Sequence, residues 1–433
     1  MKKSFSILTL GCKVNQYESE AMSELFENKG YIPVNAEIEV SDVYIINTCT
    51  VTNLSDRKSR QFIRRAKRDN PDSTVIVVGC YSQVAPEEVA AINGVDIVIG
   101  TTERNKIVEL YEEFDKSKKQ INIVRSLKGD RAFQPIEISK ENDMTRAYMK
   151  VQDGCNRYCT YCIIPFARGS IRSRSIEDSV NEARRLANAG YKEVVLTGIH
   201  VGSYGYDLGK ERLIDLIEAI AEVEGIKRIR LSSVEPRTIT EDFMIRAVKT
   251  KKVCDHFHLS LQSGSNKILE KMNRKYTREE YLQKVELIRK YMPNAALTTD
   301  VIVGFPTEND DDFLDSYDLI KRAKFSRIHV FKYSKRAGTI AADMENQVDG
   351  NVKNKRSSIL IDLNESLMRD FAKENLGKVH EVLFEEKLLD GKYVGYTTNY
   401  IKCSIDSDID LRNTLKKVEI IDVNEEPVSV KLI

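Results

Sequence analysis

The chain has 433 residues, a formal net charge of +1, eight cysteines and no tryptophan. A chain of this length is expected to fold as two to four domains, each with a core of its own. The near-neutral charge excludes a protein that attracts nucleic acid through bulk electrostatics alone. The chain has no run of the roughly 18 apolar residues that a membrane helix needs and no secretion signal. We therefore expect a cytoplasmic protein without a membrane partner.

Residues 1–100 alternate short apolar runs with helical patterns, which predicts a parallel sheet covered by helices. Strands are expected at residues 6–10, 43–46, 74–78 and 97–99, and helices at 15–29, 55–69 and 86–92. Cys12, Cys49 and Cys80 follow the first three strands. Because the carboxyl ends of parallel strands share one edge of a sheet, these three thiols can meet there.

The second expected helix carries a strongly basic run. Seven Lys and Arg residues and no acid occur from Arg57 to Arg68. Two interpretations stay open: a solvated helix face, as charge runs commonly are, or a surface that contacts phosphates.

Residues 116–143 are polar and are expected to link an N-terminal domain, 1–115, to a central domain, 144–370. Strands of the central domain are expected at residues 147–151, 193–197, 228–231, 256–259, 297–303 and 327–333. The first helix between them should begin after the cap Ser175 and end before Gly190. Six such units predict a partial barrel of parallel strands, in which the loops after the strands carry the function.

Three cysteines, Cys155, Cys159 and Cys162, follow the first strand of the central domain within eight residues. An iron–sulfur cluster held by three cysteines leaves one iron without a protein ligand, where a substrate or cofactor can bind. Structural zinc is the alternative, although zinc sites take four ligands at other spacings. Cys254 and Cys403 belong to no such pattern and are expected to be small buried residues.

A long helix at 351–375 precedes five expected strands at 380–384, 392–397, 401–404, 416–422 and 428–432. They predict a small barrel at 371–433, a fold that often binds RNA. Tyr393, Tyr396 and Tyr400 are candidates for stacking on bases. Residues 372–433 hold nine Lys and Arg against twelve Asp and Glu, so an RNA contact there must use a local patch.

The spacing of Cys155, Cys159 and Cys162 resembles the cluster motif of the radical S-adenosylmethionine enzymes. Further segments resemble those of one family among them, the methylthiotransferases: residues 11–18, 47–52, 79–81, 152–155, 163–169, 196–200, 261–265 and 300–306. Residues 371–433 resemble the RNA-binding TRAM barrel that ends family members. Thr307 departs from a glycine that is common in the family, and Ala337 departs from a common proline.

The resemblance implies an N-terminal open parallel α/β sheet domain, a central partial (β/α)6 radical S-adenosylmethionine barrel and a C-terminal small antiparallel TRAM β-barrel. It also implies two 4Fe-4S clusters. Cys155, Cys159 and Cys162 would hold the first, which binds S-adenosylmethionine at its open iron and cleaves it to a deoxyadenosyl radical. The second cluster, which would supply the sulfur, has the ligands Cys12, Cys49 and Cys80.

Four further residues are expected to bind the cofactor: Tyr161, His200, Gln262 and Gly304. For His200, a hydrogen-bonded structural role is the alternative. Arg168, Arg172 and Arg174 could bind phosphate or the cofactor carboxylate, or hold the cysteine loop through its carbonyl groups. No catalytic side chain is assigned.

The segments 12–15 and 47–52 resemble one branch of the family. That branch adds a methylthio group to carbon 2 of N6-threonylcarbamoyladenosine next to the anticodon of tRNA, using two S-adenosylmethionine and a sulfur donor. The alternatives are the isopentenyladenosine branch and, from another class, a non-catalytic iron–sulfur protein that binds RNA. The expected partners are tRNA and an electron donor such as flavodoxin or ferredoxin, and the protein is expected to be a monomer.

Overall fold

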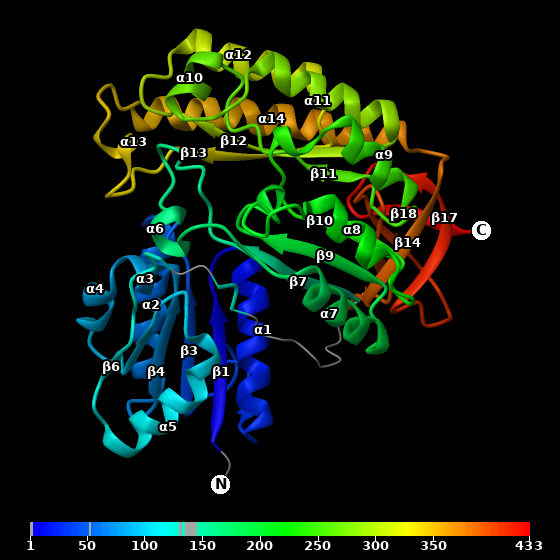
Figure 1. The fold of residues 1–433 in the computed structure, drawn as a ribbon. Helices are drawn as coiled ribbons and strands as arrows, with labels where there is room; N and C mark the ends of the chain where they lie inside the picture. The colour runs from blue at the N-terminus through cyan, green and yellow to red at the C-terminus, as the bar shows by residue number, and fades with distance from the viewer. Residues whose placement is uncertain (1–2, 52, 130–131, 135–144) are drawn as a thin grey trace. The chain divides into compact units, whose positions relative to one another are not determined.

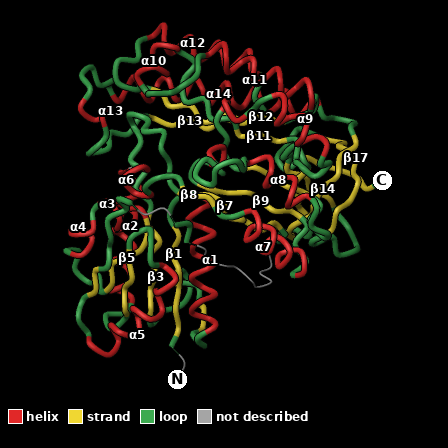
Figure 2. Tube along the Cα trace, in the orientation of Figure 1, coloured by secondary structure: helices red, strands yellow, loops and turns green. Residues whose placement is uncertain are grey.

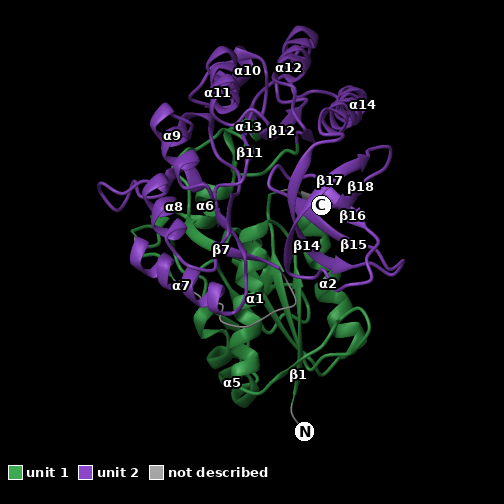
Figure 3. Cartoon of the chain, turned by 90° about the vertical axis from the view of Figure 1, so that its right-hand side faces the viewer, with its two compact units in different colours: residues 1–140, 150–174, 334–342 green, residues 141–149, 175–333, 343–433 purple. Residues whose placement is uncertain are grey.

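The computed structural model describes residues 3–51, 53–129, 132–134 and 145–433. The chain divides into two compact units, coloured separately in Figure 3. Unit 1 comprises residues 1–140, 150–174 and 334–342, and unit 2 comprises residues 141–149, 175–333 and 343–433. The loop with Cys155, Cys159 and Cys162 thus falls in unit 1, with the N-terminal cysteines. Residues 130–131 and 135–143 of the expected linker lie outside the described residues.

Unit 1 is built on a six-stranded parallel sheet, seen in the blue and cyan part of Figure 1. The strand order is β2-β1-β3-β4-β5-β6. The strands are β1 (Ser4–Thr9), β2 (Ile32–Pro33), β3 (Val43–Thr48), β4 (Thr74–Gly79), β5 (Ile97–Ile99) and β6 (Ile121–Asn122). β3 and β4 are buried along their whole length, as strands covered on both faces are. The four strands predicted here are present, whereas β2 and β6 are too short to leave a pattern in the sequence.

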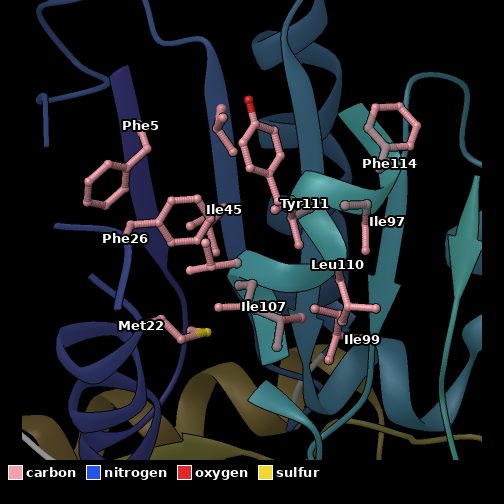
Figure 4. Close-up of a cluster of buried hydrophobic side chains, with 14 residues drawn as sticks. Phe5, Met22, Phe26, Ile45, Ile97, Ile99, Ile107, Leu110, Tyr111 and Phe114 are labelled. Atoms are coloured by element: carbon pink, nitrogen blue, oxygen red, sulfur yellow. The ribbon is translucent and has the colours of Figure 1, made fainter. Parts of the chain in front are cut away.

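Helices cover both faces of this sheet. They are α1 (Lys13–Asn28), α2 (Asn53–Asp69), α3 (Cys80–Val84), α4 (Pro86–Ala90) and α5 (Ile107–Ser117), with a 3-10 turn η1 (Arg104–Lys106). On one face Phe26 of α1 and Tyr111 of α5 pack with Phe5 and Ile45 of the sheet, as Figure 4 shows. α2, α3 and α4 cover the other face. The helix α5 was not predicted, and with β6 it extends the sheet into the segment expected to be a linker.

Unit 1 also contains the segment that carries the three closely spaced cysteines. There the end of β7 (Arg146–Asp153) pairs antiparallel with β8 (Arg172–Ser173), and α6 (Ile164–Arg168) lies between them in sequence. Most of α13 (Ile340–Asp343) belongs to this unit as well.

Unit 2 contains the predicted strands of the partial barrel. Beside the start of β7 lie β9 (Glu193–Gly198) and β10 (Arg228–Leu231), and a parallel sheet joins β11 (His256–His258), β12 (Ala296–Val303) and β13 (Arg327–Lys332). Two isolated parallel bridges, Ile229 to Val253 and Val234 to Leu259, connect the two sets. The prediction of six strands in an open barrel is confirmed.

The helices of this barrel are seen in red in Figure 2. They are α7 (Ile176–Asn188), α8 (Leu213–Ala221), α9 (Glu241–Lys249), α10 (Asn266–Lys271), α11 (Arg278–Tyr291) and α12 (Asp310–Ala323), with 3-10 turns η2 (Val201–Ser203) and η3 (Pro236–Thr238). The predicted cap is present, because the Ser175 hydroxyl accepts a hydrogen bond of 3.1 Å from the Asp178 amide.

The C-terminal part of unit 2 is the predicted small barrel. After α14 (Gly350–Glu374), five strands close in the order β14-β15-β16-β18-β17. The strands are β14 (Val379–Lys387), β15 (Tyr393–Thr397), β16 (Lys402–Ile405), β17 (Thr414–Asp422) and β18 (Val428–Leu432). Among the described residues, no helix is both long and apolar enough to cross a membrane.

Of the three tyrosines predicted to stack on bases, Tyr393 is buried, so the prediction is wrong for this residue. Tyr393 is 4% exposed and packs in the barrel core. Tyr400 is stacked between Tyr396 and His256, with ring centroids at 4.9 and 4.7 Å. The guanidinium of Arg146 covers Tyr396 at 4.7 Å. The rings of Tyr396 and Tyr400 are thus engaged with protein groups, and their stacking on bases stays a prediction.

Candidate functional site

Three cysteines stand at the carboxyl edge of the parallel sheet in unit 1. Cys12 lies at the start of α1, Cys49 follows β3, and Cys80 begins α3 directly after β4. Cys49 and Cys80 are buried, and Cys12 is exposed. Burial and the neighbouring thiols of Cys80 and Cys12 raise the pKa of Cys49 to about 11. The three thiols are therefore electrostatic neighbours at one edge of the sheet.

Two glycines allow the cysteine loops to approach each other closely. Gly11 has φ +116°, and a Cβ atom there would lie 2.9 Å from Cβ of Cys49. Gly79 has φ +109°, and its Cβ would lie 2.6 Å from the Thr48 carbonyl oxygen. Both positions combine left-handed backbone with contacts too short for a side chain, which explains the glycine before Cys12 and before Cys80.

Two asparagines connect the loops of Cys12 and Cys49. The Asn15 side-chain amide donates to the carbonyl groups of Leu10, at 2.8 Å, and Thr48, at 2.9 Å. The Asn47 side-chain amide donates to the Asn15 carbonyl at 2.9 Å. The asparagines of the segments 12–15 and 47–49 thus act as structural links between cysteine loops.

The loop with Cys155, Cys159 and Cys162 closes on itself. The Cys155 amide donates to the Gly169 carbonyl at 3.0 Å. Gly154 has φ +71°, and a Cβ atom there would lie 1.9 Å from the Ser170 carbonyl oxygen. All three thiols are partly exposed. The closed loop therefore presents three accessible thiols on a backbone that is tied at both ends.

These thiol sets fit iron–sulfur clusters better than a single metal ion. Within the described ranges, no group of three or more Cys, His, Asp or Glu residues could hold one metal ion. A cluster binds each thiolate to a different iron, so its cysteines need not converge on a single point. The donor chemistry fits as well, because three cysteines in each set supply the soft thiolate ligands that such clusters take.

Arg168 connects the loop of the closely spaced cysteines to the sheet edge. Its side chain is fully buried, and its Nε lies 3.2 Å from the Sγ of Cys80. Its Nη1 donates to Glu18 at 2.6 Å, and its Nη2 donates to Asn15 at 2.8 Å. Burial raises the pKa of the Cys80 thiol, and the Arg168 cation opposes that shift. The Arg168 guanidinium thus donates to side chains of the sheet edge and not to loop carbonyl groups, one of the roles considered from the sequence.

Glu18 is the centre of this buried charge network. Besides Arg168, it accepts from Lys150 at 2.7 Å and pairs with Arg104 at 2.9 Å. Burial alone would raise the pKa of Glu18, but Arg104, Arg168 and Lys150 together hold it well below the usual range. Sequence analysis gave Glu18 no role, although the residue ends the family-like segment 11–18, because its partners lie up to 150 residues away in the chain.

Two more arginines stabilise the cysteine loops. Arg172 donates to the carbonyl groups of Arg168 at 2.9 Å and Ser170 at 3.3 Å, which confirms the loop-holding interpretation for this residue. Arg336 donates to Asp56 of α2 at 2.7 Å and to the Thr50 hydroxyl. Since Thr50 follows Cys49 directly, Arg336 anchors that cysteine loop from a distant part of the sequence.

The other expected cofactor residues lie in loops. Tyr161 is half-buried between Cys159 and Cys162 in unit 1. In unit 2, His200 follows β9, its Nδ1 hydrogen-bonds the Ser203 hydroxyl, and its Nε2 lies 3.7 Å from Glu235. Gln262 and Gly304 follow β11 and β12, both with positive φ. Their contacts with a cofactor stay predictions.

The remaining predictions concern single residues of unit 2. Cys254 and Cys403 are buried at 2% and 0% exposure, as predicted. Thr307, which replaces a common glycine, has φ +71°, a region that β-branched residues rarely adopt. Its hydroxyl accepts a hydrogen bond of 2.7 Å from Lys271. The left-handed backbone thus explains why glycine is common at this position. The hydrogen bond with Lys271 offsets part of the strain that this backbone places on Thr307.

Comparisons with known proteins give a consistent picture. Residues 149–320 match the radical SAM superfamily, and residues 4–100 match a family described as uncharacterized protein family UPF0004. Threonylcarbamoyladenosine tRNA methylthiotransferase MtaB of Bacillus subtilis (strain 168) is 45% identical over 418 residues, 95% of this chain and 92% of that protein. A tRNA-2-methylthio-N(6)-dimethylallyladenosine synthase of Carboxydothermus hydrogenoformans is 37% identical over 429 residues, 97% of each chain.

Solved structures support the fold. The methyltransferase TsrM of Kitasatospora setae, with cobalamin and a [4Fe-4S] cluster bound, has a TM-score of 0.57 at 14% identity, over 79% of this chain and 77% of that one. The radical enzyme OxsB with aqua-cobalamin has a TM-score of 0.52 at 13% identity, over 94% of this chain and 65% of that one. Together with the cysteine geometry and the full-length relatives, these matches show that the chain belongs to the radical S-adenosylmethionine methylthiotransferases.

Proposed function

We propose that the chain adds a methylthio group to carbon 2 of N6-threonylcarbamoyladenosine, next to the anticodon of tRNA. The observation that supports a methylthiotransferase best is that both cysteine sets lie in one compact unit, in which Arg168, which follows the closely spaced cysteines, contacts Cys80 of the other set. Two relatives named for this substrate are 45% and 40% identical and a third is 37% identical, whereas several named for dimethylallyladenosine are 37% or 38% identical. These identities make isopentenyladenosine, which the names of those relatives call dimethylallyladenosine, the second candidate substrate.

The proposed partners are tRNA and a one-electron donor such as flavodoxin or ferredoxin, with the enzyme acting as a cytoplasmic monomer. The hydrogen at carbon 2 of adenine is not acidic enough for any side-chain base to remove. Radical chemistry from a bound cofactor is therefore required, and the protein's part is to bind, orient and exclude water. This agrees with a site in which no side chain is assigned as general base.

In the proposed enzyme, Cys155, Cys159 and Cys162 would hold a 4Fe-4S cluster that supplies the electron for cleaving S-adenosylmethionine, and Cys12, Cys49 and Cys80 would hold a second cluster that supplies sulfur. Arg168 orients Cys80 by donating to its sulfur, and Glu18 holds Arg168 in place. Burial of Cys49 and Cys80 keeps water away from that side of the site.

The substrate base must leave the anticodon stack to reach such a site. Proteins read single-stranded RNA loops by splaying bases out, and enzymes that modify a base extrude it. A nucleotide beside the anticodon lies in such a loop, so its unstacking costs less than opening a duplex would.

The number of clusters is tested by iron analysis. We expect the anaerobically reconstituted protein to bind about eight irons per chain, from two four-iron clusters with three cysteines each. Replacing Cys12, Cys49 and Cys80 by Ala should leave about four irons, and Cys403→Ala is the matched control with full iron content. A wild-type value of four that is insensitive to Cys12, Cys49 and Cys80 would contradict the proposal.

The substrate is tested by mass spectrometry of tRNA nucleosides from cells that lack the protein. We expect methylthio-threonylcarbamoyladenosine to disappear while its precursor without the methylthio group remains. The plasmid-borne wild-type gene should restore the modification, and Cys155→Ala should not. Loss of the methylthio derivative of isopentenyladenosine instead would assign the chain to the second candidate.

A non-catalytic RNA-binding role makes a different prediction for the isolated protein. The enzyme should convert S-adenosylmethionine to deoxyadenosine and methionine under strong reduction, even without tRNA. Absence of deoxyadenosine from a fully iron-loaded sample would favour the binding role.

A further inference from the structure

The outer face of α2 is a row of cations, defined here as the α2 basic face: Arg57, Lys58, Arg64 and Arg68. All four side chains are exposed, and so is Gln61 between them. Positions 57, 61, 64 and 68 follow the helical repeat of three or four residues, so they share one side of the helix. No apolar side chain interrupts this row.

The less exposed cations of α2 form ion pairs with the acids nearby. Lys67 pairs with Asp96 at 2.9 Å and Arg65 with Asp69 at 3.1 Å. Arg60 pairs with Glu88 at 3.3 Å, and Asp56 of the same helix is taken by Arg336.

The outer cations are left without such partners. Arg57, Lys58 and Arg64 form no ion pair with any residue that the structure describes. Arg68 contacts Asp69 at 3.4 Å and remains 75% exposed. The α2 basic face thus carries positive charge that the fold itself does not neutralise.

The start of α2 also lies close to the cysteines of the proposed reaction site. α2 begins four residues after Cys49, at the sheet edge with the cysteines, and its 17 residues run back along the sheet. At a rise of about 1.5 Å per residue, the helix is about 25 Å long. Its cations therefore extend from the proposed reaction site over a distance that spans several consecutive phosphates of a nucleic acid strand.

We propose that the α2 basic face binds the phosphate backbone of the tRNA stem that leads away from the modified nucleotide. The inference rests on the proposed function and adds a docking surface to it. Phosphate contacts orient a nucleic acid without reading its sequence, which suits an enzyme whose specificity lies in one base. The C-terminal barrel region has more acids than bases, so its net charge does not supply an attraction for tRNA.

An acidic protein, such as an electron donor, is the competing occupant of a basic surface. Protein interfaces have an apolar core surrounded by a polar rim, whereas every exposed residue of this row is charged or an amide. Three of the four cations are arginines, whose planar guanidinium groups match phosphate oxygens with two hydrogen bonds. Both features favour RNA over a protein partner.

The test is the salt dependence of tRNA binding to the full chain. The probe is tRNA from cells that lack the protein, which carries the precursor nucleoside. For the variant R57A/K58A/R64A, we expect the slope of log affinity against log salt concentration to fall by about 2 to 3, because each phosphate contact contributes nearly one. At about 0.1 M salt the affinity should fall at least ~10-fold.

Two matched variants separate this effect from general changes in charge or fold. K29A/K116A/K119A removes three exposed cations, one just after α1, one in the last turn of α5 and one just after α5, at the opposite edge of the sheet, and should bind tRNA like wild type. R57K/R64K keeps the charges and should retain the wild-type slope. Iron content and deoxyadenosine formation should be unchanged in all of them.

Three outcomes would overturn the proposal. The first is wild-type affinity and slope for R57A/K58A/R64A. The second is normal tRNA binding by this variant with slower reduction by flavodoxin, which would assign the face to the electron donor. In the third, the wild-type chain itself does not bind tRNA, and the proposed function would then fail together with this inference.

Discussion

Unit 1 uses cations in two regions in opposite ways. Beside the cysteines, Arg168, Arg104 and Lys150 surround the buried carboxylate of Glu18. On the α2 basic face the cations point into solvent, and Arg57, Lys58 and Arg64 form no ion pair with the described residues. Salt screens exposed charges beyond about 10 Å at 0.1 M, but it hardly reaches buried pairs. The same residue types therefore determine geometry where they are buried and affinity for a partner where they are exposed.

The largest effect should follow from breaking the buried network. Glu18→Gln leaves Arg168, Arg104 and Lys150 without their shared anion, and breaking a buried pair costs about 3–5 kcal/mol. Urea unfolding of the apoprotein should show this loss, with little dependence on salt. Glu113→Gln, on the exposed side of α5, is the control and should change the free energy of unfolding by less than ~0.5 kcal/mol. A loss below ~1 kcal/mol for Glu18→Gln would contradict the role given to the network.

Arg336 should have an intermediate effect, because its pair with Asp56 is slightly exposed at 10% and 12%. Arg336→Gln is expected to lower the free energy of unfolding by about 2–3 kcal/mol, since Asp56 and the Thr50 hydroxyl lose their partner. In a double-mutant cycle with Asp56→Asn, the coupling energy should be about 1–3 kcal/mol. Additive effects of the two substitutions would show that the ion pair does not stabilise the fold.

Glu20 is a partly buried acid whose charge is unfavourable. Burial raises its pKa to about 7, although a hydrogen bond with Gln16 opposes the shift. A pKa raised in the folded state stabilises the fold below the unfolded value, and that contribution is lost as the pH rises through the folded value. The free energy of unfolding of Glu20→Gln relative to wild type should therefore rise by about 1–2 kcal/mol as the pH increases from 5 to 8. A stability difference that is independent of pH would show that Glu20 has an ordinary pKa.

The smallest effect on stability is expected on the α2 basic face. Arg64→Ala should change the free energy of unfolding by less than ~0.5 kcal/mol at any salt concentration, because its side chain is exposed and forms no ion pair with the described residues. Thermal unfolding of the apoprotein at low and high salt measures this directly. A large, salt-dependent loss would mean that the exposed cations also serve the fold, and the contrast between the two regions would disappear.

Much of the fold could be predicted because it follows from local patterns. The apolar runs of β3 and β4 and the basic helix α2 appear at the expected positions. The prediction for Tyr393 was wrong for a tertiary reason, since closure of the barrel buries its ring in a core that includes Val418 and Val428 of later strands. α5 was missed although its apolar residues recur at helical spacing, and nothing in the sequence showed that it would cover the sheet next to α1.

By itself, the sequence determined the chemistry of the site: the spacing of Cys155, Cys159 and Cys162, and a cysteine after each of three strands. Such features are local, because a few consecutive residues and the direction of a strand suffice to define them. The tertiary structure alone decided that Arg168 donates to Cys80 and is held by Glu18. Partners of this kind are chosen by burial, since an ion must find an opposite charge when folding removes it from water, and that charge can come from any part of the chain.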